Sequence, residues 1–116
     1  MKKIIIILVL LIKNYSLLRI LQIIETKKLV LRGKSLEFGA SVDNKKNFSY
    51  FLKNKKFFEY SNISNEKNKK IIPLDLRKKL EIKPGIYSNV LIYNVLEHID
   101  DHTIEFREIK KILSKN

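Results

Sequence analysis

The chain has 116 residues, 45% of them hydrophobic, and a formal net charge of +12 at pH 7. This length accommodates one domain at most, and this hydrophobic content argues against a chain that is disordered as a whole. With no cysteine and only two histidines, the sequence excludes disulfides, cysteine nucleophiles and a histidine-rich metal site, so we expect no bound metal. The excess charge is mostly lysine spread along the chain rather than one basic patch or an arginine-rich helix, so we expect no nucleic-acid binding either.

Residues 1–30 are predicted to form an apolar and basic helical segment. Two lysines precede nine uninterrupted apolar residues, 4–12, and further apolar residues recur at helical spacing over 17–24. We therefore predict one or two helices over residues 3–28 that cover a sheet or a partner.

The alternatives for this segment concern the membrane. The nine apolar residues would extend about 14 Å as a helix, against roughly 30 Å of bilayer hydrocarbon, so a spanning helix is a poor fit. The basic and apolar composition leaves peripheral membrane contact through residues 1–24 as an alternative. A signal peptide is a weaker one, because no Ala-x-Ala-like cleavage site follows. We therefore expect a cytoplasmic protein, with membrane-peripheral attachment as the variant.

In residues 31–116, short apolar runs alternate with polar or small residues. We predict a strand ending at Gly39, a short helix over 44–56, extended segments over 56–62 and 71–76, a polar loop over 64–70, a strand over 90–92, and a helix over 101–114 that is capped by Asp100 or Asp101. The run over 90–92 is short and continuously apolar, which suits a strand buried on both faces of a parallel sheet. This order of elements predicts the front part of an open α/β sheet, whose ligands bind at the carboxyl ends of the strands.

Three stretches of this second segment resemble a known family. Residues 36–41 read LEFGAS, residues 89–99 read NVLIYNVLEHI, and residues 108–113 read EIKKIL. The first is similar to the L-(D/E)-x-G-x-G motif of class I S-adenosylmethionine-dependent methyltransferases, the second to the fourth-strand motif of that family, and the third to the helix that follows it. The match is nearest to the type 11 methyltransferases and covers residues 34–114. It implies a partial methyltransferase domain over 31–116, with a Rossmann-like three-layer α/β sandwich.

The resemblance also implies which residues bind the cofactor, S-adenosyl-L-methionine. They are Glu37, Gly39, Ala40, Ser41, Asn62, Asp75, Leu76 and Asn94. Glu37 would hold the ammonium group of the cofactor, and the backbone N–H groups from Gly39 to Ser41, at a helix start, would hold its carboxylate. Asn62 would accept hydrogen bonds from the ribose hydroxyls, and Asp75 would meet the adenine amino group beside the backbone of Leu76. Candidates for the acceptor side are Asn94, Glu97 and His98, although the resemblance assigns no catalytic residue there.

Each of these assignments has a purely structural alternative. Gly39 can serve as a turn glycine, Asp75 as a loop or capping carboxylate, and Asn94 as a helix cap. Glu97 and His98 can form a helix-start pair as readily as a catalytic acid and base.

The chain also departs from the family pattern. Only one glycine follows the first strand, and Asn62 stands where the family has an acid, which weakens the hydrogen bonds available to a ribose. The sequence ends before the Lys-Pro-Gly-Gly turn and the later strands of the family, so we expect a sheet truncated after the fourth strand and its helix, with an unpaired edge on that strand.

These observations lead to two functional hypotheses. The first is S-adenosylmethionine-dependent methyl transfer to an unidentified small-molecule or saccharide acceptor, or the cofactor-binding front part of such an enzyme. The alternative is a catalytically inactive, methyltransferase-like binding or interaction module.

Overall fold

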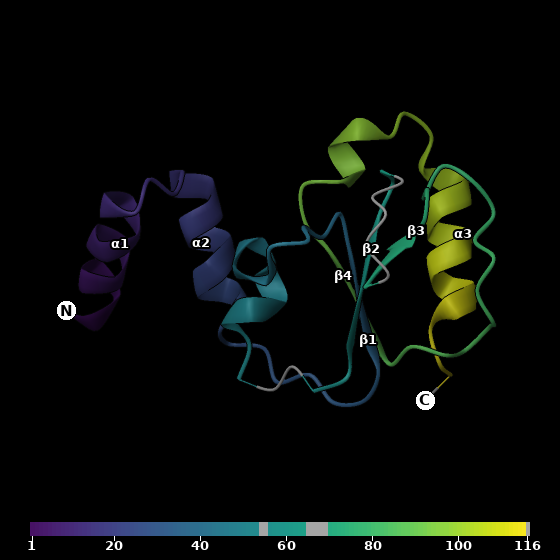
Figure 1. Cartoon of the computed structure of the whole chain (residues 1–116), viewed down its shortest axis with the longest axis horizontal. Helices are drawn as coiled ribbons and strands as arrows, with labels where there is room; N and C mark the ends of the chain where they lie inside the picture. The colour runs from purple at the N-terminus through teal and green to yellow at the C-terminus, as the bar shows by residue number, and fades with distance from the viewer. Residues whose placement is uncertain (54–55, 65–69, 116) are drawn as a thin grey trace.

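The structure is a computed structural model that describes residues 1–53, 56–64 and 70–115. Its elements in chain order are α1 (Lys2–Ile12), α2 (Leu17–Thr26), β1 (Ser35–Phe38), the 3-10 helices η1 (Asn44–Lys46) and η2 (Phe48–Phe51), β2 (Phe58–Asn62), β3 (Ile71–Pro73), β4 (Asn89–Ile92), the 3-10 helix η3 (Leu96–His98), and α3 (His102–Ile112). Figure 1 shows the sheet between α3 on one side and α2 with η1 and η2 on the other. The predicted α/β class is confirmed.

The four strands form one parallel sheet in the order β3-β2-β1-β4. In the central strand β1, Glu37 lies in register with Tyr60 of β2 and Leu91 of β4. A parallel arrangement brings the carboxyl ends of all four strands to one edge of the sheet. This architecture is compatible with a Rossmann-like fold, and β4 lies at the edge of the sheet, as predicted.

The burial of β4 differs from the prediction. Val90 and Ile92 are only partly buried, and Leu91 is the buried residue of that strand. All four residues of β1 are buried instead. The position of β4 at the sheet edge explains the difference, because an edge strand has a neighbour on one side only. A groove lined by Leu29, Leu31 and Leu113 runs along this edge.

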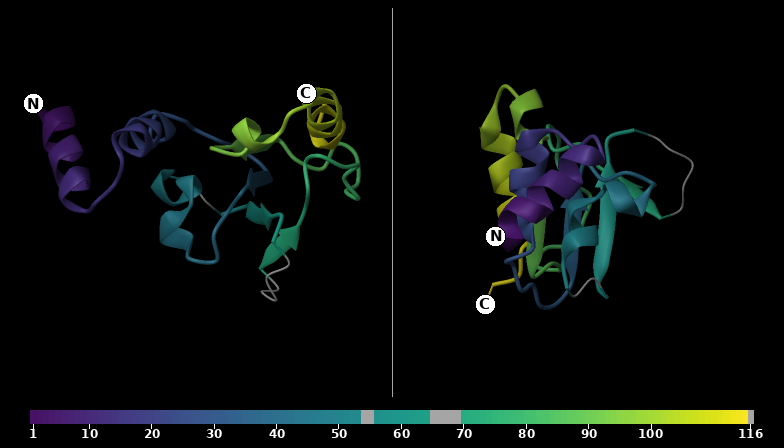
Figure 2. Two further views of the ribbon diagram at one scale, coloured as in Figure 1. Left: turned by 90° about the horizontal axis from the view of Figure 1, so that it is seen from above. Right: turned by 90° about the vertical axis from the view of Figure 1, so that its left-hand side faces the viewer.

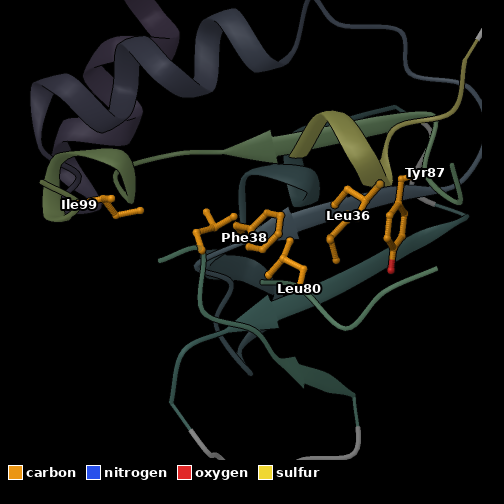
Figure 3. Packing of buried hydrophobic residues seen from close by; sticks show 7 residues of the cluster. Leu36, Phe38, Leu80, Tyr87 and Ile99 are labelled. Carbon is orange, nitrogen blue, oxygen red and sulfur yellow. The ribbon is translucent and has the colours of Figure 1, made fainter. Parts of the chain in front are cut away.

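The two faces of the sheet carry separate apolar cores. Leu36 and Phe38 of β1 pack toward α3, together with Leu80, Tyr87 and Ile99 (Figure 3). On the other face, buried residues of α1, α2 and η2 form a second cluster, which consists of Leu10, Ile20, Ile23 and Phe48. The alternation of side chains along β1 divides its residues between these cores, so that the carboxylate of Glu37 points away from the α3 side.

The segment after β1 also differs from the prediction. Instead of one helix over 44–56, the chain forms two short 3-10 helices, and residues 54–55 lie outside the described residues. Asn47, between these helices, has an extended backbone with φ −82° and ψ 148°, and its side chain bonds Ser41. Asparagine competes for backbone groups in this way and so favours a break in a helix.

The extended segment predicted over 71–76 is shorter in the structure, where only Ile71–Pro73 form strand β3, whereas the final helix begins at one of its two predicted caps. Strand β3 ends at Pro73, which cannot donate to a ladder and suits the sheet edge that β3 occupies. Asp101 caps α3 by accepting a hydrogen bond from Thr103 N at 2.9 Å. Most of the polar loop predicted over 64–70 lies outside the described residues. Among the helices that the structure describes, none has the length and apolar character needed to cross a membrane.

Candidate functional site

A cavity of about 540 Å³ lies at the carboxyl ends of the strands. Its volume falls in the range of about 300–1,000 Å³ that is usual for small-molecule sites. The predicted site residues that line it are Glu37, Gly39, Ser41, Asn62, Asp75, Leu76, Asn94 and His98. Ala40, which is buried, and Glu97, which is exposed, lie outside the lining. The residues selected along the sequence therefore converge on one cavity, although they come from several separate segments.

Glu37 is the buried carboxylate of this cavity. Its side chain projects from the middle of β1, and the residue is 2% exposed. One carboxylate oxygen accepts a hydrogen bond from Phe48 N at 2.7 Å, and the other accepts one from Ser49 N at 3.0 Å. Both amides belong to the first turn of η2, whose own N-cap makes no side-chain capping bond. Glu37 therefore supplies hydrogen-bond acceptors for the first backbone amides of η2 and fixes this 3-10 helix against the sheet.

Gly39 makes the turn that leaves β1. Its φ is +69°, and a Cβ atom at this position would lie 2.6 Å from Val95 Cγ2. Glycine is thus favoured here for two independent reasons, a left-handed backbone and close packing against the segment that follows β4.

The amides that follow Gly39 already have partners within the chain. Ala40 N donates to Ser61 O at 2.9 Å, and Ser41 N donates to Asn47 Oδ1 at 2.6 Å. Asn47 Nδ2 returns a hydrogen bond to Ser41 O at 2.9 Å. The turn also leads into an irregular segment rather than directly into a helix. The backbone N–H groups of Ala40 and Ser41, which we expected to bind the carboxylate of a ligand, therefore donate to acceptors within the protein instead.

Asn62, at the carboxyl end of β2, also bonds within the chain. Its Nδ2 donates to Ala40 O at 2.8 Å, and its Oδ1 accepts from Ser64 N at 3.2 Å. These bonds fix the orientation of the amide, because the nitrogen can only donate and the oxygen can only accept. The oxygen keeps capacity for one further hydrogen bond at the cavity wall.

Asp75, after β3, forms a bidentate ion pair with Arg77. Arg77 Nε and the backbone N of Arg77 donate to Asp75 Oδ1 at 2.9 and 3.0 Å, and Arg77 Nη2 donates to Oδ2 at 2.9 Å. The hydrogen bond from the Arg77 guanidinium holds the pKa of the Asp75 carboxyl below its usual value. Asp75 is therefore a charged group of fixed direction. The adjacent Leu76 is buried in the core that faces α3.

Three predicted site residues follow β4: Asn94, whose side-chain amide is hydrogen-bonded, and the exposed residues Glu97 and His98. Asn94 has a left-handed backbone, with φ +55°, and its side chain forms a reciprocal amide pair with Gln22 of α2 at 2.9 and 3.3 Å. Glu97 Oε1 and His98 Nε2 are 3.7 Å apart, and both side chains are largely exposed. Of this pair, only His98 reaches the cavity lining.

Helix α2 contributes a wall that the sequence prediction did not assign to the site. Arg19 lines the cavity, its guanidinium lies 4.6 Å from the ring centroid of Phe48, and its Nη2 donates to Lys46 O. The Phe48 ring in turn stacks on Tyr93 with a centroid separation of 4.0 Å. The signal for this wall was present in the sequence, because Arg19 and Gln22 are polar residues three positions apart in α2 and so share one face.

Comparisons of the chain with protein-family models, with curated proteins and with solved structures gave no match.

The packing of Gly39 can be tested against a matched glycine. Gly85 has the same φ of +69°, but a Cβ atom there would find its nearest neighbour at 4.0 Å. We expect Gly85→Ala to lose roughly 1–2 kcal/mol of unfolding free energy from backbone strain alone. Gly39→Ala should lose a further 1–3 kcal/mol or so, because its Cβ must also displace Val95. Urea denaturation of both variants measures the difference, and equal losses would contradict the proposed crowding.

The state of Asp75 can be tested by a pH titration of its carboxyl carbon by NMR. In Arg77→Gln, the pKa of Asp75 should rise toward the usual value, because the main group that lowers it is gone. Lys78→Gln removes the same charge from a residue with a smaller influence, so the pKa should rise less. Because the native pKa is lowered, the ionised carboxylate stabilises the fold at neutral pH, and that contribution disappears as the pH falls through the native pKa. A pKa of Asp75 that is unchanged in Arg77→Gln would show that the ion pair does not form.

Proposed function

We propose that the chain binds S-adenosyl-L-methionine in the cavity at the carboxyl ends of its strands, as the cofactor-binding part of a class I-like methyltransferase. The acceptor of the methyl group would be a small molecule or saccharide. One observation carries the proposal: all of the cofactor-binding residues selected by the resemblance except Ala40 line one cavity of suitable size. They come from the ends of β1, β2 and β4 and from the segment after β3.

The sheet order supports the same location. The order β3-β2-β1-β4 reverses direction between β1 and β4, and open α/β sheets bind ligands in the crevice at such a switch point. Gly39 leaves β1 at this point, and Val95 follows β4 across from it. Both residues line the cavity.

The charged groups of the cavity suit a ligand that carries charges of both signs. Glu37 would face the ammonium group, since each of its oxygens accepts one amide N–H and retains a further lone pair. Asp75 would accept a hydrogen bond from the adenine amino group, and the oxygen of Asn62 would accept one from the ribose.

Arg19 is our candidate partner for the carboxylate of the cofactor. The amides of Ala40 and Ser41 are already bonded within the chain, whereas Arg19 stands on the cavity wall. A guanidinium has five N–H donors, so the bond to Lys46 O leaves others for a ligand.

The chemistry that the cofactor supplies when bound is a methyl group on a sulfonium centre. The protein would hold the cofactor and the methyl acceptor and orient them toward each other. Such positioning can account for much of the rate of a two-substrate reaction. Asn94, in its fixed amide pair with Gln22, would stand beside the sulfonium side of the cavity. Glu97 and His98 would lie at the side from which an acceptor enters.

A second function is favoured by a specific observation. The amides of Ala40 and Ser41, the side chain of Asn62 and the carboxylate of Asp75 all have partners within the fold. Because these groups already form hydrogen bonds within the chain, they have less capacity to bind a cofactor. This arrangement suits a methyltransferase-like binding module that has no catalytic activity. Cofactor binding separates the two hypotheses.

Isothermal titration calorimetry with S-adenosyl-L-methionine provides the test. We expect the wild-type chain to bind, and Asp75→Asn to bind about five- to tenfold more weakly, because a neutral amide replaces a charge-assisted acceptor. Asp101→Asn is the matched control, since it removes the same charge from the cap of α3, outside the cavity lining, and asparagine also caps helices well.

Two outcomes would contradict the proposal. If the wild-type chain gives no binding heat at millimolar cofactor, the second function is favoured. If Asp75→Asn and Asp101→Asn weaken binding equally, the cofactor does not contact Asp75 where we place it.

A further inference from the structure

The two N-terminal helices expose an extensive apolar surface. Helix α1 lies at one end of the long axis of the molecule, beyond α2, and Figure 2 (right) views that side. We call the exposed large apolar residues of the two helices the hairpin apolar surface; they are Ile4, Ile5, Leu8, Val9, Leu11 and Ile12 of α1 and Leu17, Leu18 and Leu21 of α2. Contiguous exposed apolar patches of this kind usually mark an interaction site.

Few side chains of α1 are buried by packing within the molecule. Leu10 is its only buried residue, and Ile6 and Ile7 are partly buried against the core that α2 and η2 share. The rest of the helix is apolar around its circumference, which is typical of a helix that lies against a partner or in lipid. Its 11 residues extend about 16 Å, which is too short to cross a bilayer but long enough to lie along its surface.

The charges that border this surface are all positive on α1. Lys2 and Lys3 stand at its start and Lys13 follows its end, and all three are exposed. Helix α1 contains no acidic residue. On α2, the carboxylate of Glu25 is paired with Lys28. Lysines that flank an apolar surface are complementary to anionic lipid headgroups.

The same charges argue against a second copy of the chain as the occupant. If α1 packed against α1 of another copy in a parallel arrangement, Lys2 and Lys3 would face their own counterparts. In an antiparallel arrangement they would face Lys13 of the other copy. Both arrangements bring like charges together without an acidic residue of α1 to compensate.

We propose that the hairpin apolar surface docks onto an anionic lipid surface, with the lysines at both ends of α1 contacting the headgroups. Helix α2 links this surface to the cavity, because Leu17, Leu18 and Leu21 face outward while Arg19 lines the cavity. Docking would therefore leave the cavity wall uncovered and hold it close to the bilayer. This proposal does not depend on methyl transfer.

Flotation of the full chain with lipid vesicles tests the proposal. The wild-type chain should bind vesicles of phosphatidylcholine mixed with phosphatidylserine, should bind vesicles of phosphatidylcholine alone much more weakly, and should be released by salt. Leu8→Ser combined with Ile12→Ser should weaken binding at least about tenfold, because two exposed apolar side chains of one helix face are lost. Phe106→Ser is the matched control: it removes an exposed apolar side chain from α3 and should not change binding.

A second pair of variants tests the charges. Replacing Lys2, Lys3 and Lys13 by Gln should strongly reduce the preference for anionic vesicles, whereas Lys110→Gln on α3 should leave it nearly unchanged. Size-exclusion chromatography with light scattering completes the experiment. Absence of vesicle binding, binding that ignores lipid charge, or a dimer that dissociates in Leu8→Ser with Ile12→Ser would each overturn the proposal.

Discussion

The carboxylate of Glu37 joins the sheet to the wall of the cavity. Burying a carboxylate is costly unless its oxygens have partners, and the first-turn amides of η2 supply those partners. The position of η2 thus depends on a residue of the central strand. Phe48, the first residue of η2, stacks on Tyr93 after β4 and lies under the guanidinium of Arg19. Glu37 thereby fixes η2, and Phe48 of η2 contacts α2 and the end of β4 around the cavity.

The hydrogen bonds within the turn after β1 also determine how the cavity can bind a ligand. Gly39 turns the chain out of β1, and the reciprocal hydrogen bonds between Ser41 and Asn47 bring it back toward η2. In dinucleotide-binding turns, several glycines leave backbone N–H groups open to a phosphate or carboxylate. Here the protein uses the amides of Ala40 and Ser41 for its own fold. A ligand in this cavity must therefore be recognised mainly by side chains, which is why the directions of Asp75, Asn62 and Arg19 matter.

The parallel α/β sheet could be predicted from local patterns, whereas the site residues were selected by the family resemblance and converge because they lie at the carboxyl ends of parallel strands. Short apolar runs mark the strands, and parallel strands bring their carboxyl ends together. The sequence analysis allowed Asp75 to be a loop carboxylate but did not predict its ion pair with Arg77. The break at Asn47 was not predicted either, because it depends on a hydrogen bond to Ser41 that only the folded turn creates. The partial exposure of Val90 and Ile92 follows from the edge position of β4. The family resemblance predicted that position, but the apolar run over 90–92 on its own predicted a strand buried on both faces.

Amide hydrogen exchange at Phe48 and Ser49 tests the role of Glu37 most directly. Both amides donate to the buried carboxylate, so they should exchange slowly in the wild-type chain despite the shortness of η2. In Glu37→Gln one acceptor oxygen becomes an NH₂ group, which leaves an amide of η2 without a partner. Protection at one or both positions should then fall by about tenfold or more, while the amides of β2 keep theirs. Rapid exchange in the wild-type chain, or protection that Glu37→Gln leaves unchanged, would contradict the account.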